Sequence, residues 1–164
     1  MIIIGIDPGV SGAAALIDHD GFLELFDLPT VSMESSGRTK RKLDAGKLAT
    51  MIREALTRHD GAENHVEIWL EDVHTMPGNA SGSSANTSLM HSKGVIEGVA
   101  GALGYRVNLV GSRKWKKVFG ASADKDHSIN LAHSLYPDAP ITLKKHHNRA
   151  EAIMIARYGM RERF

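Results

Sequence analysis

Apolar residues recur along the chain in two patterns, one typical of strands and the other of helices. Short apolar or alternating stretches predict strands at residues 2–7, 13–17, 22–28, 66–73 and 105–110. Helical spacing predicts helices after an N-cap at Asp44 and at residues 85–103, 112–119, 125–135 and 147–158. The polar segments Thr30–Lys42 and Met76–Ser84 are expected to be mobile loops. The chain is therefore β-rich first and α/β afterwards.

The first predicted strand ends in a carboxylate, Asp7, and Pro8-Gly9 turns the chain directly after it. Such a side chain lies at the rim of a sheet, close to the core and open to ligands. Mg²⁺ is bound by one or two carboxylates of this kind together with substrate phosphates. A lone Asp-Pro-Gly fits an Asp that only caps its turn equally well. Further carboxylates at matching places in the chain would favour the metal-binding role over the turn cap.

Glu71 is the second carboxylate, near the end of the strand predicted at residues 66–73. If that strand is parallel to the first, Glu71 lies beside Asp7 at the same edge of the sheet. Its neighbour Asp72 points to the opposite face, so at most one of the two shares the site. Because Trp69 shares its face with Glu71, we expect Glu71 to point inward.

Glu151 is the third carboxylate, in the last predicted helix. It lies three and four positions after Asn148 and His147, so the three side chains can share one face. An oxygen-rich site of this kind suits phosphodiester chemistry, in which two cations about 3.5–4 Å apart activate water and stabilise the leaving oxygen. The alternative is a surface Glu near a helix N-terminus, where a negative charge is favourable anyway.

Composition narrows the class of protein. The 164 residues are enough for one core, and we expect residues 1–164 to form a single domain. A content of 42% hydrophobic and 24% charged residues is typical of a soluble globular chain. Neither a membrane span nor a secretory signal is recognisable, so a cytoplasmic protein is expected. The absence of cysteine excludes disulfides, Cys-based zinc sites and thiol catalysis.

The net charge of +1 conceals three clusters of basic residues. Clustered cations on a nearly neutral chain are typical of a protein that binds a polyanion, although solvated surface lysines explain any single cluster equally well. The clusters are Arg38, Lys40, Arg41, Lys42 and Lys47; Arg113, Lys114, Lys116 and Lys117; and Lys144, Lys145 and Arg149, with His146 and His147 beside them.

Taken together, these motifs resemble the RuvC family of Holliday junction resolvases. The resemblance rests on Gly5-Ile-Asp-Pro-Gly9 with Ser11-Gly12, on Leu70-Glu71 and on Arg149-Ala-Glu-Ala152, in the family's order over essentially the whole chain. The last motif is similar to the phage-type branch. The family consists of RNase H-like endonucleases that use Mg²⁺ or Mn²⁺. The resemblance therefore implies an α/β, RNase H-like fold with a mixed five-stranded sheet flanked by helices.

The resemblance also implies a function and the residues that perform it. The protein would cut four-way DNA junctions by paired symmetric nicks, using two Mg²⁺ or Mn²⁺ ions and leaving 5′-phosphate and 3′-hydroxyl ends. Its catalytic residues would be Asp7, Glu71, Glu151, Lys116 and Lys125, the two lysines meeting the scissile phosphate. Its DNA contacts would be Arg41, Lys42, His74, Met76, Arg113, Lys114 and Lys117.

Two places depart from the family pattern. One turn before the last carboxylate the family has an Asp or His as a fourth metal ligand, where this chain offers His147 and Asn148. Imidazole suits Mn²⁺ better than Mg²⁺, and asparagine offers only a neutral amide oxygen. Where several relatives carry a stacking aromatic residue, this chain has His74 and Met76, which can stack on bases or wedge between them.

The helix predicted at residues 85–103 carries Gly94, Gly98 and Gly101 on one face. Glycine costs about 1 kcal/mol in a helix interior, so three on one face predict the close approach of another backbone. That backbone belongs either to the sheet of the same chain or to a second copy. In RuvC-like proteins this helix lies at the two-fold interface, and a symmetric dimer supplies the two active sites that paired cuts require.

Three other functions also fit parts of the sequence. Actin-like ATPases and sugar kinases resemble this chain in the Gly-Ile-Asp-Pro-Gly start, but they need two such domains and a second phosphate motif, for which 164 residues leave no room. A module that binds branched DNA without cutting it predicts the same basic face and dimer, but no dependence on metal. A nuclease of the same fold for other branched or RNA-containing DNA is not distinguished by sequence. Only the ATPase and kinase alternative involves a small-molecule substrate, and we expect none for this protein.

Overall fold

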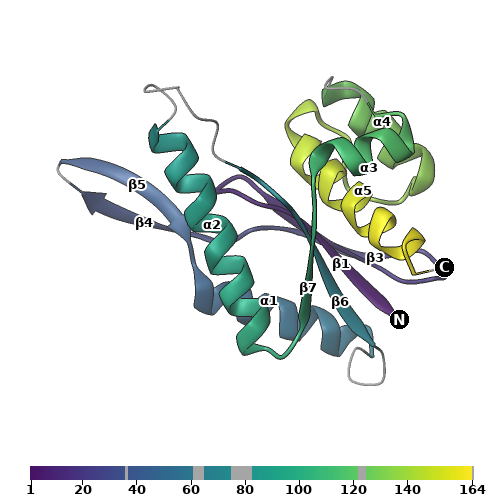
Figure 1. Ribbon diagram of the computed structural model, residues 1–164, viewed down its shortest axis with the longest axis horizontal. Helices are drawn as coiled ribbons and strands as arrows, with labels where there is room; N and C mark the ends of the chain where they lie inside the picture. The colour runs from purple at the N-terminus through teal and green to yellow at the C-terminus, as the bar shows by residue number, and fades with distance from the viewer. Residues whose placement is uncertain (36, 61–64, 75–82, 122–124, 164) are drawn as a thin grey trace.

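A mixed sheet of five strands forms the centre of the computed structural model, which describes residues 1–35, 37–60, 65–74, 83–121 and 125–163 (Figure 1). Its strand order is β3-β2-β1-β6-β7. β1 is antiparallel to β2 and parallel to β6. The strands are β1 (Ile2–Asp7), β2 (Ala13–Ile17), β3 (Phe22–Asp27), β6 (Val66–Glu71) and β7 (Arg106–Val110).

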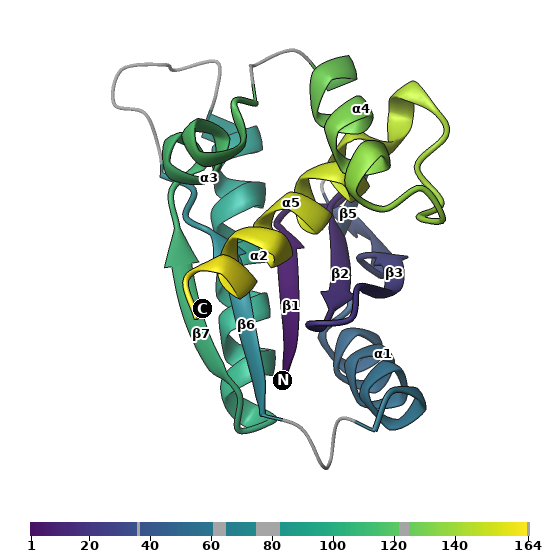
Figure 2. The same ribbon diagram turned by 90° about the vertical axis from the view of Figure 1, so that its right-hand side faces the viewer.

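Helices cover both faces of this sheet (Figure 2). One face packs against α1 (Ala45–Arg58) and α2 (Ser83–Ala102), and the other against α3 (Ser112–Phe119), α4 (Lys125–Leu135) and α5 (His147–Arg161). The mixed five-stranded sheet flanked by helices confirms the predicted α/β fold class. Among the described residues, no helix is both long and apolar enough to span a membrane.

β1 is buried on both faces, as expected for a central strand with helices on either side. Ile2, Ile4 and Ile6 belong to the core beneath α1 and α2, whereas Ile3 belongs to the core beneath α5. Because side chains alternate along a strand, Asp7 shares the α5 face with Ile3.

α5 approaches the sheet closely because small residues line the contact. A Cβ atom on Gly5 of β1 would lie 2.2 Å from the backbone nitrogen of Ala156 and 2.3 Å from the carbonyl oxygen of Ala152. One on Gly159 would lie 2.5 Å from the Trp69 ring of β6. These glycines fix the height of the helix above the sheet. Figure 2 shows α5 crossing β1 and β6 in this way.

Most of the predicted elements are present, with small shifts at their ends. Asp44 caps α1 as predicted, since its carboxylate accepts a hydrogen bond of 2.9 Å from the backbone N–H of Lys47. The strand predicted at residues 66–73 ends at Glu71, and the last helix continues to Arg161. The predicted loop at Met76–Ser84 lies largely outside the described residues, and Ser83 already begins α2.

The prediction of a mobile loop at Thr30–Lys42 is wrong. The segment forms a separate two-stranded sheet from β4 (Thr30–Ser35) and β5 (Arg38–Leu43). The two strands pair in register over their whole length, and a turn containing Gly37 at φ 72° connects them. The alternation from which strands are recognised is limited here to Val31 and Met33, because most other positions of the two strands are polar.

The glycines of α2 do not face the sheet. Its buried side consists of Ile96, Val99 and Ala100. Gly94, Gly98 and Gly101 are exposed, and nothing outside the helix's own backbone lies within 4 Å of a Cβ atom built on any of them. The close approach that the sequence predicts is therefore not made by the sheet of the same chain.

Replacing Gly5 by alanine is expected to displace α5, because the added methyl group would overlap backbone atoms that cannot move separately. We expect Gly5→Ala to lower the free energy of unfolding in urea by about 3 kcal/mol. The matched control is Gly46→Ala in the first turn of α1, where the nearest atom is 3.6 Å from the added Cβ. That variant should be more stable than the wild type by about 0.5–1 kcal/mol. Equal effects of the two substitutions would contradict the packing argument.

Candidate metal centre

Three carboxylates converge at the carboxyl ends of β1 and β6. Ile6 pairs with Leu70 in the parallel ladder, so Asp7 and Glu71 leave the sheet side by side. Glu151 reaches them from α5, and the three side chains place carboxylate oxygens within 4.8 Å of one another. The structure therefore brings together the three carboxylates that the sequence singled out.

Local sequence explains why Asp7 lies where it does. Pro8 has no backbone N–H with which to continue the ladder, and Gly9 turns the chain at φ 130°. Asp7 is thus the last residue of β1, and its side chain points toward α5 while only 8% of the residue is exposed. Glu71 has the same exposed fraction at the end of β6.

Asp72 plays a different part from its neighbour, as predicted. Its carboxylate accepts from the Lys93 ammonium of α2 at 2.5 Å and lies 3.0 Å from Nε2 of His74. The hydrogen bond from Lys93 lowers the pKa of Asp72. This pair ties the segment after β6 to α2. His74, predicted to contact DNA bases, is exposed beside it.

The carboxylates line a cavity of about 550 Å³ that opens to solvent. Its walls come from the β1–β2 turn, from the first turns of α2 and α5, and from α3. The lining residues that matter for the chemistry are Asp7, Glu71, Lys116, His147, Asn148 and Glu151. A phosphate group and hydrated cations can be accommodated in this volume.

Burial and mutual repulsion make two of the carboxyl groups reluctant to ionise. The pKa of Asp7 is well above its ordinary value, first because the group is buried and then because Glu151 and Glu71 are close. The pKa of Glu71 is also raised, mainly by burial and by Glu151. A hydrogen bond between Asp7 and Glu71 favours a shared proton on this pair. The indole N–H of buried Trp115 lowers the pKa of Glu71, although it makes no hydrogen bond of normal geometry.

Lys116 is the cation at the centre of the site. Its ammonium lies 3.1 Å from Oε1 of Glu151 and 4.9 Å from the centroid of the Trp115 ring. Trp115 is fully buried and anchors α3, so the position of Lys116 is set by the core. The predicted catalytic lysine thus lies among the carboxylates. Lys125 begins α4, and its side chain lies outside the described residues.

The candidates for a fourth metal ligand, His147 and Asn148, both line the cavity but do not belong to the carboxylate cluster. The Asn148 side-chain amide donates to the carbonyl oxygen of Ser11 in the β1–β2 turn. Asn148 therefore holds α5 against that turn. Of the two candidates, this leaves His147 as the one whose side chain could supply a fourth metal ligand, through a ring nitrogen.

Arg149 does not contribute to a free basic surface, contrary to the sequence-based interpretation of its cluster. Its guanidinium donates to both carboxylate oxygens of Asp27 at 2.7 Å and to the carbonyl oxygen of Pro140 at 3.2 Å. The bidentate pair lowers the pKa of Asp27. It fixes the first turn of α5 to the end of β3, two residues before Glu151. No sequence pattern pointed to this pairing.

The other predicted DNA contacts lie on two elements beside the cavity. Arg113, Lys114 and Lys117 are exposed on α3, the helix that also carries Lys116. Arg41 and Lys42 are exposed on β5. Met76 lies outside the described residues.

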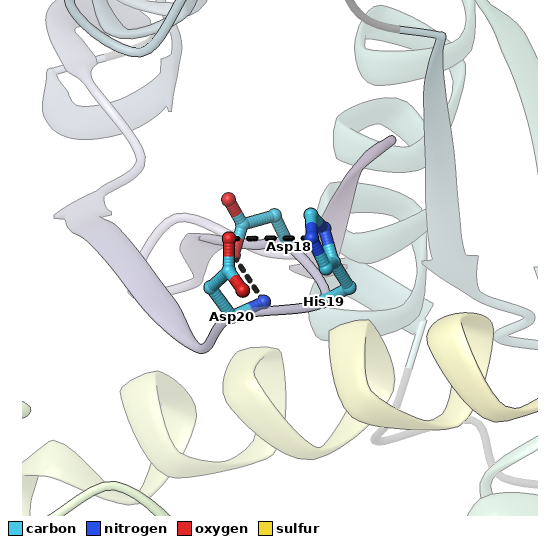
Figure 3. A group of neighbouring side chains, drawn as sticks. All are labelled: Asp18, His19 and Asp20. Carbon is cyan, nitrogen blue, oxygen red and sulfur yellow. Dashed lines mark hydrogen bonds and ion pairs between the residues drawn. The ribbon is translucent and has the colours of Figure 1, made fainter.

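A second acidic cluster occurs at the tip of the β2–β3 hairpin (Figure 3). The Asp18 carboxylate accepts backbone hydrogen bonds from Asp20 and Gly21 at 2.9 and 3.0 Å. The His19 ring lies 3.3 Å from the Asp20 carboxylate. Because Asp18 already caps its own turn, and His19 and Asp20 are exposed, the cluster is explained as turn structure.

Known structures provide a comparison for the fold. A structure described as Thermus thermophilus RuvC in complex with Holliday junction substrate has a TM-score of 0.62 and 16% sequence identity, with 99% of this chain and 96% of that chain covered. A further T. thermophilus RuvC structure has a TM-score of 0.53 at the same identity and coverage. No family model and no curated protein matches the sequence.

The similarity extends over nearly the whole of both chains, including the sheet and the helices on each face. At 16% identity it is a similarity of fold, and the position of the carboxylates comes from the geometry of this chain alone. The chain therefore has the RNase H-like fold of RuvC, as the resemblance in its sequence implied.

Proposed function

We propose that the protein is a metal-dependent endonuclease that resolves four-way DNA junctions by paired symmetric nicks. One observation carries this proposal. Carboxylates from β1, β6 and α5 meet beside a lysine in an open cavity, on the fold of a nuclease that has been seen with a Holliday junction.

The residues of the cavity fit a hard divalent cation. Three carboxylates with close oxygens repel one another, and burial together with the charge of Glu151 raises the pKa values of Asp7 and Glu71. A bound cation would offset both effects. Asp7, Glu71 and Glu151 would hold Mg²⁺ or Mn²⁺, with His147 available as a nitrogen ligand that suits Mn²⁺ better. Such a cation, or a pair of them, supplies Lewis acidity toward the phosphate and lowers the pKa of water.

The chain's own groups position and neutralise the substrate. A water oxygen attacks the phosphorus, the bond from phosphorus to O3′ breaks, and the products are a 5′-phosphate and a 3′-hydroxyl. Lys116, held near Glu151 in the free protein, is placed to donate to a non-bridging phosphate oxygen as negative charge spreads over it. Arg113, Lys114 and Lys117 follow on the same helix and would bind the neighbouring backbone.

Cleavage of a labelled four-way junction tests the proposal directly. In Mg²⁺ or Mn²⁺ we expect paired symmetric nicks, with none in EDTA and at least about 100-fold slower cleavage by Asp7→Asn. Asp20→Asn in the exposed β2–β3 turn is the matched control and should cut at the wild-type rate. Products are resolved on denaturing gels beside duplex and flap substrates.

Tight binding of the junction without cleavage in either metal would refute the nuclease and favour a non-cleaving module that binds branched DNA. The absence of an Asp one turn before Glu151, where this chain has His147 and Asn148, is the feature that favours this second function. Faster cleavage of flaps than of junctions would instead identify a nuclease for other branched DNA.

Thermal unfolding in EDTA tests the electrostatics of the site. The pKa values of Asp7 and Glu71 are raised in the folded state, so the folded protein holds protons more tightly than the unfolded chain. The free energy of unfolding therefore falls as pH rises from about 4 through these raised values. Asp7→Asn removes one of the repelling charges and should melt at a higher temperature than the wild type at pH 8, with the difference vanishing near pH 4.

Adding metal should reverse the order of the melting temperatures of the wild type and Asp7→Asn at pH 8. An ion that binds only the folded state raises the melting temperature, so excess Mn²⁺ at pH 8 should stabilise the wild type and leave Asp7→Asn nearly unchanged. Asp20→Asn should respond as the wild type does. Equal metal-induced shifts for the wild type and Asp7→Asn would show that the ion binds elsewhere.

We also propose a homodimer that packs the glycine face of α2 against its copy. Gly94, Gly98 and Gly101 are exposed and uncovered, and glycines allow two helix backbones to approach. A symmetric dimer supplies two carboxylate sites for paired nicks.

Sedimentation velocity tests the dimer. The wild type should sediment as a dimer and Gly98→Arg as a monomer, because a long charged side chain would separate the helices. Gly46→Arg, at an exposed position of α1, is the control and should remain dimeric. A monomeric wild type, or a dimeric Gly98→Arg variant, would rule out this interface.

A further inference from the structure

The β4–β5 hairpin stands apart from the main sheet. Its strands pair only with each other among the described residues, and β5 is the strand beside α2. Figure 1 shows the hairpin extending beyond the body of the molecule on the side of α2. Leu43 at its base is buried in the core, whereas Val31 and Met33 are 44% and 46% exposed. The base of the hairpin is thus packed into the core, whereas Val31 and Met33 farther along it are exposed to solvent.

A hollow of about 630 Å³ separates β5 from α2. Its lining residues are Val10, Thr39, Lys40, Arg41, Lys42, Thr87, Ser88 and His91. Val10 and Ser88 also line the carboxylate cavity, so the two hollows adjoin. Arg41 lies at the junction, because its guanidinium donates to Oγ of Ser11 at 3.4 Å and Ser11 belongs to the wall of the carboxylate cavity.

The charge of this groove is uncompensated. Within the described residues, Lys40, Arg41 and Lys42 form no ion pair, and no carboxylate lines the groove. Other cations of the chain behave differently. Lys93, Arg149 and Arg163 each contact a carboxylate at 2.7 Å or less. Three exposed cations held without a counter-ion next to the catalytic cavity favour an external polyanion.

The spacing of the cations suits an extended ligand. Lys40 and Lys42 lie on one face of the hairpin with Met33 and Val31, their cross-strand partners, and Arg41 lies on the other. Two residues along a strand span roughly 7 Å. Positive charges repeated over such a distance match successive phosphates better than a single anion. Thr39 adds a hydroxyl, which is a common donor to phosphate oxygens.

We infer that the groove between β5 and α2 binds the sugar–phosphate backbone of a duplex DNA arm and leads it to the carboxylate cavity. Arg41 contacts the phosphates nearest the scissile position from one face of β5, and Lys40 and Lys42 contact the backbone from the other face of the same strand. This inference rests on the proposed nuclease function, because it takes the adjoining cavity as the place where the strand is cut.

Salt dependence of binding tests the groove without any cleavage. Binding of a fluorescent four-way junction is measured by anisotropy in EDTA across a series of salt concentrations. Each lost phosphate contact lowers the slope of log K against log salt by about 0.9, so the triple variant Lys40→Gln, Arg41→Gln, Lys42→Gln should lose about 3 from the slope. The matched control carries Arg53→Gln, Arg106→Gln and Arg161→Gln, three exposed arginines outside the groove, and should keep the wild-type slope.

Unchanged circular dichroism of both triple variants verifies that the fold is intact. An unaltered slope for the hairpin variant, an equal loss in the control, or no junction binding by the wild type would overturn the groove assignment. Preferential binding of an RNA duplex, or equal competition by polyglutamate, would overturn its assignment to DNA. Absence of metal-dependent cleavage, with the expected loss of slope, would refute the nuclease and leave the groove supported.

Discussion

The close approach of α5 to β1 is the contact on which the rest of the structure depends. Gly5 leaves room for the backbone of the helix at Ala152 and Ala156, and this sets both the height and the register of the helix above the sheet. Glu151 lies one residue before Ala152, so its carboxylate reaches the edge where Asp7 ends β1. A thicker layer between helix and sheet would separate the carboxylates, whatever their identity.

The same contact also brings the negatively charged side chains of Asp7, Glu71 and Glu151 close together, and the packed core keeps them there. Asp7 and Glu71 are buried next to Glu151, and only Lys116 among the described cluster neighbours supplies opposing charge. The packing of Trp115 and the strand ladders prevent the carboxylates from moving apart. Stability is thus lower in the absence of a cation than it would be with neutral side chains. Perturbed groups of this kind are typical of functional sites.

Sequence reasoning found the elements whose signals are local. The apolar strand before Asp7, the N-cap at Asp44 and the helical spacing around Glu151 each have a fixed physical cause within a few residues. The β4–β5 hairpin was missed because its faces meet solvent and its apolar alternation is limited to Val31 and Met33, which is too short to mark a strand. The pairing of Arg149 with Asp27 was missed because it joins residues 122 positions apart. Long-range contacts of charged groups leave no local pattern.

Asp7 and Glu151 are also far apart in the sequence, because β1 is the first strand and α5 the last helix. The two elements nevertheless pack against each other. During synthesis the first strand leaves the ribosome long before the last helix exists. A nascent chain can pair β1 with β2 and β6, yet its third carboxylate arrives only when α5 emerges and docks on the sheet. Contacts between segments this distant in sequence form slowly during folding. The order of synthesis therefore keeps the three carboxylates apart until α5 is present, so a chain that ends before α5 cannot assemble the cluster.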